Sequence, residues 1–123
     1  MSTETKLDVK VNLVNDSIGI ITIQGELTVF IQEFDLLYKE VMAYTKMGLY
    51  RFIIDLNAVS YIDSSGIGIL MRLATNASKQ SSMICVICNH PQTLKIMAVS
   101  NIDKIVKFVQ STQEGMDFYS SKK

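Results

Sequence analysis

The pattern of apolar and polar residues along the chain predicts a protein built from both strands and helices. Apolar residues alternate with polar ones over residues 7–13, as in a half-buried strand. A polar turn at 15–17 and a second apolar segment at 18–23, ended by Gly25, indicate a β-hairpin. Three later apolar runs have the length of buried strands, at residues 50–56, 83–88 and 105–109.

Between these strands, apolar residues recur at three- and four-residue steps, which is typical of amphipathic helices. Gly48 and Asn101 suit the left-handed conformation that often ends a helix, and Pro91 suits a first helical turn because it lacks an N–H. Helices are therefore expected at residues 31–47, from Asp63 to about Ala77, from Pro91 to Asn101, and from a cap at Ser111 to about Tyr119.

The resulting order of elements, ββαβαβαβα, predicts a single α/β domain. Strands that alternate with helices pair in parallel through right-handed crossovers, and the N-terminal hairpin adds an antiparallel edge. We expect a small, mostly parallel sheet with helices packed on it. The domain is expected to span residues 7–120, with residues 1–6 and 121–123 as flexible termini.

Charge and composition narrow the function classes. The chain has 12 Lys and Arg against 12 Asp and Glu, without a local basic cluster, so we expect no nucleic-acid partner. No apolar run approaches the roughly 20 residues of a membrane-spanning helix, and the polar N-terminus is unlike a secretory signal. We therefore expect a cytoplasmic protein without membrane insertion and without a cofactor.

Cys85 and Cys88 have the spacing of redox and zinc motifs, and His90 would be a third zinc ligand. A structural zinc site needs four ligands, and a redox pair needs a helix N-terminus that lowers the thiol pKa. The two cysteines lie instead in a continuous apolar run, and residues three apart on a strand point to opposite faces. We interpret both as core residues and expect no metal site.

The candidate functional residues lie in the segment Ser-Tyr-Ile-Asp-Ser-Ser-Gly-Ile-Gly at 60–68, between the third strand and the second helix. Functional sites of parallel α/β sheets lie at the carboxyl ends of the strands. Asp63 and Ser64 are good N-cap residues, and Gly66 and Gly68 would leave the first turn accessible to a partner. Taken alone, however, the same segment would also suit an ordinary capped helix.

Residues 56–70, Leu-Asn-Ala-Val-Ser-Tyr-Ile-Asp-Ser-Ser-Gly-Ile-Gly-Ile-Leu, closely resemble the signature of STAS domains (sulfate transporter and anti-sigma factor antagonist). The Gly-Glu-Leu segment at 25–27 resembles the one that follows the family's second strand. Pro91 and the apolar residues Ile102, Ile105 and Phe108 resemble its C-terminal third. The similarity covers residues 7–120 and agrees with the predicted order of elements.

In the stand-alone bacterial members of this family, the Ser after the Asp is phosphorylated by a kinase that is also the anti-sigma factor. The resemblance therefore implies that Ser64 is the phosphorylation site and that the unmodified protein binds an anti-sigma factor/serine kinase of the histidine-kinase-like ATPase type. This binding would release a sigma factor, phosphorylation would end it, and a metal-dependent serine phosphatase would reverse the mark. Such a protein is a signalling protein that regulates transcription by partner switching.

A phosphate adds about −1.5 to −2 charges, which the N–H groups and dipole of a helix N-terminus tolerate, so the change should be felt by the partner. Thr28 occupies a position where many antagonists have Asp, in a loop that commonly touches the partner. Tyr61 is either a contact residue or a partly buried aromatic at the strand end. The expected partner-binding residues are Thr28, Tyr61, Asp63, Ser64, Ser65, Gly66 and Ile67.

Two other functions are compatible with parts of the sequence. The resemblance also fits a STAS scaffold subunit of a stress-signalling or lipid-transport complex without a sigma factor partner. An enzyme would use Ser64 or Ser65 as nucleophile and His90 as base, since both follow strands at one sheet edge. Because the chain has neither a Gly-x-Ser-x-Gly elbow nor a phosphate-binding P-loop, we predict that it is not an enzyme.

Overall fold

The computed structural model describes residues 7–28 and 33–121, and confirms the predicted order of elements. Of the termini expected to be flexible, residues 1–6 and 122–123 lie outside the described residues, as does the expected helix start at Ile31. Ser121, expected in the flexible C-terminal segment, is instead the last residue of a helix. The elements are β1 Leu7–Val14, β2 Ile18–Leu27, α1 Glu33–Lys46, β3 Arg51–Ile62, α2 Ser64–Lys79, β4 Ile84–Ile87, α3 Pro91–Val99, a 3-10 turn η1 Ile102–Lys104 that the sequence did not predict, β5 Val106–Phe108, and α4 Thr112–Ser121.

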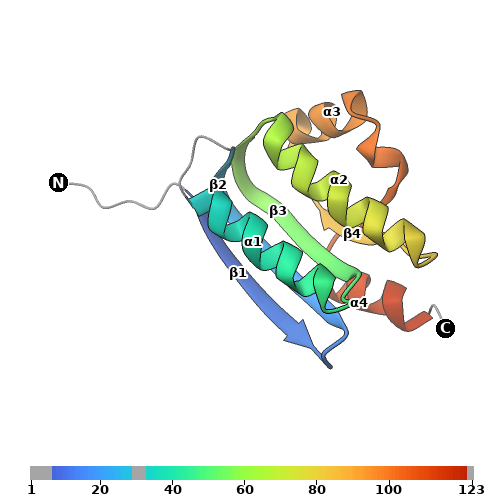
Figure 1. The fold of residues 1–123 in the computed structure, drawn as a ribbon. Helices are drawn as coiled ribbons and strands as arrows, with labels where there is room; N and C mark the ends of the chain where they lie inside the picture. The colour runs from blue at the N-terminus through green and yellow to red at the C-terminus, as the bar shows by residue number, and fades with distance from the viewer. Residues whose placement is uncertain (1–6, 29–32, 122–123) are drawn as a thin grey trace.

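The five strands form one sheet in the order β1-β2-β3-β4-β5 (Figure 1). The β1–β2 pair is the predicted antiparallel hairpin, and all other neighbours are parallel. Asn15 and Asp16 both have positive φ, and the Ser17 amide donates to the Val14 carbonyl at 3.1 Å, as in the type I′ turns that suit hairpins. Asn101 ends α3 in the predicted left-handed conformation, with φ of 61°.

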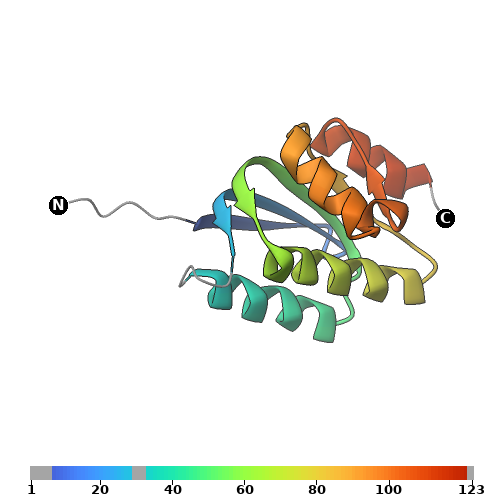
Figure 2. The ribbon, with the colours of Figure 1, turned by 90° about the horizontal axis from the view of Figure 1, so that it is seen from above.

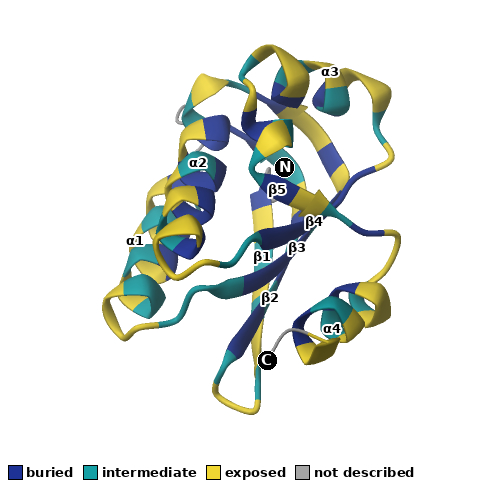
Figure 3. Ribbon diagram, turned by 90° about the vertical axis from the view of Figure 1, so that its right-hand side faces the viewer, coloured by how far each residue is buried: buried dark blue, intermediate teal, exposed yellow. Residues whose placement is uncertain are grey.

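Helices cover both faces of the sheet (Figure 3). Helices α1 and α2 cover one face and enclose the larger apolar core, to which α3 contributes Met97. Helix α4 covers the other face, where Tyr119 packs with Ile18 and Ile53. Within the described residues, no helix is both long enough and apolar enough to cross a membrane.

Strands β2 and β3 are longer than the sequence predicts. The end expected at Gly25 lies instead at Leu27, and the end expected at residue 56 lies instead at Ile62. The pairing of β2 with β3 is irregular at two places in this extended part. Thr22 pairs with Asp55 but Gln24 with Ala58, and Gly25 pairs with Val59 but Glu26 with Tyr61. Each step adds one unpaired residue to β3, as a β-bulge does. The buried residues of this half of β3 are consequently three positions apart: Leu56, Val59 and Ile62.

The two cysteines point to opposite faces of the sheet, as predicted. Cys85 packs on the α4 side and Cys88 in the core beneath α1 and α2, and both are free and buried. Burial raises the pKa of Cys85 to about 11 and also raises that of Cys88, so both thiols are protonated near neutral pH.

Candidate functional site

The first turn of α2 is organised by the side chain of Asp63. This residue has extended backbone geometry and is the N-cap of the helix. Its Oδ1 atom accepts hydrogen bonds from the amides of Ser65 at 2.9 Å and Gly66 at 3.1 Å. Two amides that have no carbonyl partner inside a helix are thereby satisfied. The N–H groups that are expected to tolerate a phosphate at this helix end therefore do not include these two, because Asp63 already occupies them.

The second carboxylate oxygen of Asp63 connects this turn to the end of β2. The Thr28 hydroxyl donates a hydrogen bond to Asp63 Oδ2, although the residues are 35 positions apart. The Asp63 amide also donates to the Leu27 carbonyl at 3.4 Å. Thr28 is only 3% exposed and Asp63 is of intermediate exposure, so this connection is partly buried. Thr28 thus supplies a neutral donor to the second oxygen of the Asp63 carboxylate.

Gly66 is required by the close approach of α2 to the end of β2. A Cβ atom there would lie 2.6 Å from the Leu27 carbonyl oxygen and 2.7 Å from Ile62 Cγ1, both shorter than real contacts. The prediction that Gly66 leaves the turn accessible is therefore wrong, because its missing side chain accommodates the protein's own backbone. Gly68 meets that prediction, since it is exposed and a Cβ there would have no neighbour within 4 Å.

The predicted site residues divide into an exposed group and a buried group. Ser64 is exposed as the first residue of α2, and the Tyr61 side chain is 53% exposed, while Asp63 and Ser65 are intermediate. Thr28, Gly66 and Ile67 are buried. Any protein that approaches this turn therefore meets Ser64 and Tyr61 first, whereas the buried residues fix the shape of the turn.

The alternative Ser–His arrangement does not form among the described residues. His90 precedes α3 as its N-cap, and its Nδ1 atom is buried without a hydrogen-bond partner there. No hydrogen bond connects its side chain to Ser64 or Ser65 in the part of the chain that the structure describes. The arrangement lacks the nucleophile–base contact that an activated serine requires.

The protein family of this chain can be identified from its sequence. A model of the STAS domain family matches residues 10–115. This chain belongs to the STAS domain family. Its relatives include a STAS-domain containing protein of Pseudomonas aeruginosa, 33% identical over 57 residues. That match covers 46% of this chain and 56% of the relative, so it spans only about half of either protein.

Solved structures with the same fold include anti-sigma factor antagonists. The antagonist from Mycobacterium paratuberculosis is 18% identical, with a TM-score of 0.77 over 95% of this STAS chain and 97% of that chain. SpoIIAA in its unphosphorylated form is 15% identical, with a TM-score of 0.79 over 93% of this chain and 97% of that one. The phosphorylated form of Bacillus SpoIIAA gives 16% identity and a TM-score of 0.72, over 91% and 99%. At these identities the comparison establishes a shared fold.

Proposed function

We propose that this STAS protein is a cytoplasmic anti-sigma factor antagonist and not an enzyme. In the unphosphorylated state it binds an anti-sigma factor that is also a serine kinase of the histidine-kinase-like ATPase type. Phosphorylation of Ser64 ends that binding, and a metal-dependent serine phosphatase restores it. The partner contacts Ser64 and Tyr61 directly, while Asp63 and Ser65 lie at the edge of the contact.

The observation that supports this proposal is the exposed Ser64 side chain on a turn that is otherwise held by buried contacts. In the described part of the chain, its hydroxyl makes no hydrogen bond, so a kinase could reach it without disrupting the fold. A phosphate here would lie at the positive end of the α2 dipole, which stabilises an anion by about 0.3–1 kcal/mol at an exposed helix end. The fold should therefore tolerate the modification.

The effect on a docked partner would be larger. The phosphate would place about −1.5 to −2 charges beside the carboxylate of Asp63, on the surface where Ser64 is exposed. A close partner would meet steric bulk, a desolvation cost and repulsion from any of its own facing carboxylates. Because each 1.4 kcal/mol corresponds to about tenfold in affinity, a loss of a few kcal/mol would release the partner.

Phosphorylation and binding can be tested together with a kinase of this class from the same genome. We expect intact-mass analysis to show one added phosphate on the wild type and on the matched control Ser65→Ala, but none on Ser64→Ala. Ser64→Ala should bind the kinase constitutively and Ser64→Asp should bind it more weakly. Phosphate mapped to another residue would contradict the assignment.

The same measurements distinguish the alternative role as a scaffold subunit of a stress-signalling or lipid-transport complex. In that case a stable complex with a transporter or stress-signalling assembly would be recovered, and its affinity would be unchanged by Ser64→Asp.

A further inference from the structure

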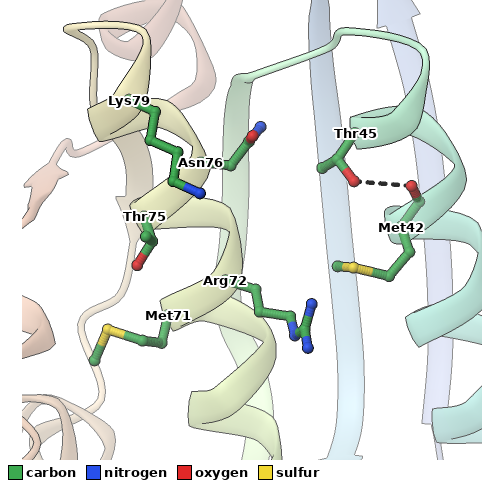
Figure 4. Close-up of a pocket in the computed structure, with 7 residues that line it drawn as sticks. All are labelled: Met42, Thr45, Met71, Arg72, Thr75, Asn76 and Lys79. Atoms are coloured by element: carbon green, nitrogen blue, oxygen red, sulfur yellow. Dashed lines mark hydrogen bonds between the residues drawn. The ribbon is translucent and has the colours of Figure 1, made fainter.

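A shallow groove runs between α1 and α2, on the side of these helices that faces away from the sheet. The two helices lie side by side in both ribbon views (Figures 1 and 2). One hollow of about 380 Å³ is lined by residues that include Met42 and Thr45 of α1 and Arg72 and Lys79 of α2. Figure 4 shows Arg72 and Lys79 extending from α2 toward α1, with Met42 extending toward them. A second hollow of about 520 Å³ shares Met42, Thr45 and Arg72 and continues the groove along α1.

The charge of this groove is of one sign. Its lining includes four cationic side chains, Lys39, Lys46, Arg72 and Lys79, and among the described residues that line it there is no carboxylate. Only Lys39 of these four is in an ion pair within the described ranges, with Asp35 at 3.1 Å. Since the whole chain has a formal net charge of zero, this basic strip is a local segregation of charge.

Stabilisation of the fold explains only part of this strip. Lys46 and Lys79 lie in the last turns of their helices, where the dipole favours a cation. Arg72 lies in the middle of α2, where the dipole gives no such benefit. Its guanidinium lies 5.8 Å from the centroid of the Tyr38 ring, an arrangement that holds an exposed arginine in place over the groove.

The geometry of the cations indicates what kind of ligand would fit. They form two rows rather than converging on one point: Lys39 and Lys46 are two helical turns apart on α1, and Arg72 and Lys79 are two turns apart on α2, so each row is about 10 Å long. A single phosphate group would contact one end of such a strip. A docked helix with carboxylates two turns apart would match a whole row, and the adaptable Met42 side chain between the rows would contact its apolar residues.

We infer that the α1–α2 groove is a second docking surface, which binds an acidic amphipathic helix of a partner protein. This surface is distinct from the phosphorylation site, because Arg72 lies about 12 Å along α2 from Ser64. The two proposals are therefore independent: the groove would bind its partner helix whether or not Ser64 is phosphorylated.

The test uses the full chain, labelled with 15N, and a synthetic amphipathic helix that carries Glu residues two turns apart. We expect saturable amide shifts around Met42, Thr75 and Lys79, and little binding of the same peptide with Gln in place of Glu. The double variant Arg72→Glu with Lys79→Glu should weaken binding by at least about tenfold, since attraction becomes repulsion at two points. The control with equal charge change, Lys95→Glu with Lys104→Glu, lies on α3 and η1 and should bind as the wild type does.

Other outcomes would overturn the inference. These are no saturable binding, shifts that map outside the groove, or equal affinity of the two double variants. The same shifts on adding inorganic phosphate alone would identify a simple anion site, and binding to vesicles containing phosphatidylglycerol but not to the peptide would identify a membrane surface. Ser64→Ala should bind the peptide normally, so failure of the phosphorylation assay and failure of this one are separable.

Discussion

Two glycines of α2 that are two positions apart should respond to the same substitution with opposite signs. In Gly66→Ala the new Cβ would lie 2.6 Å from the Leu27 carbonyl oxygen, which is backbone and cannot rotate away. Overpacking of this kind costs about 1–3 kcal/mol, while alanine restores about 0.5–1 kcal/mol relative to glycine in a helix. We expect a net loss of up to about 2.5 kcal/mol, with the cost concentrated where β2 meets the first turn of α2.

Gly68→Ala is the matched control. The new methyl group would have no neighbour within 4 Å, so only the helix-propensity gain of about 0.5–1 kcal/mol applies. Urea unfolding followed by circular dichroism measures both changes, which should appear as midpoint shifts in opposite directions at an unchanged slope. If Gly66→Ala is as stable as Gly68→Ala, the close approach of α2 to Leu27 is not as described, and the explanation for Gly66 fails.

Two hydrogen bonds and one buried thiol lead to further predictions. Thr28→Val should lower the free energy of unfolding by about 1–2 kcal/mol by removing the donor to Asp63. That cost should be smaller in an Asp63→Ala background, and a double-mutant cycle without coupling would contradict it. Tyr119→Phe should cost about 1–3 kcal/mol, because the hydroxyl bonds the buried backbone of Phe52 at 2.8 Å; an unchanged melting temperature would refute this. Burial raises the pKa of Cys85 to about 11, so the native state holds this proton more tightly than the unfolded chain does. The free energy of unfolding should therefore fall by up to about 2 kcal/mol as the pH rises from about 9 to about 11. Cys85→Ala should flatten that fall, and an equal slope in both proteins would exclude this thiol as its source.

The order of elements could be predicted from the sequence because the helices keep a three- and four-residue apolar period and the strands show either alternation or a continuous apolar run. The second half of β3 could not, since its bulges leave only every third residue buried. Leu56, Val59 and Ile62 then resemble neither a strand nor a loop. The short turn η1 was also missed, because three residues are too few to show a period.

Only the part of the site that depends on contacts between neighbouring residues could be predicted. The N-cap role of Asp63 follows from local sequence, because the groups it binds are two and three residues away. Its bond to Thr28 joins residues far apart in the chain, and nothing local indicates which side chain lies opposite. The burial of Gly66 depends on the same long-range approach. The position of Leu27, whose carbonyl faces both Asp63 and Gly66, likewise has no local signal.

The contacts of Asp63 bear on how quickly another protein could associate with this surface. Its carboxylate connects the end of β2 to the start of α2, so the backbone at Ser64 is already in one conformation before an encounter. Little conformational entropy would then be lost on docking. Association would proceed as the collision of two preformed surfaces, at about 10⁵–10⁷ M⁻¹s⁻¹, without a preceding rearrangement of the chain.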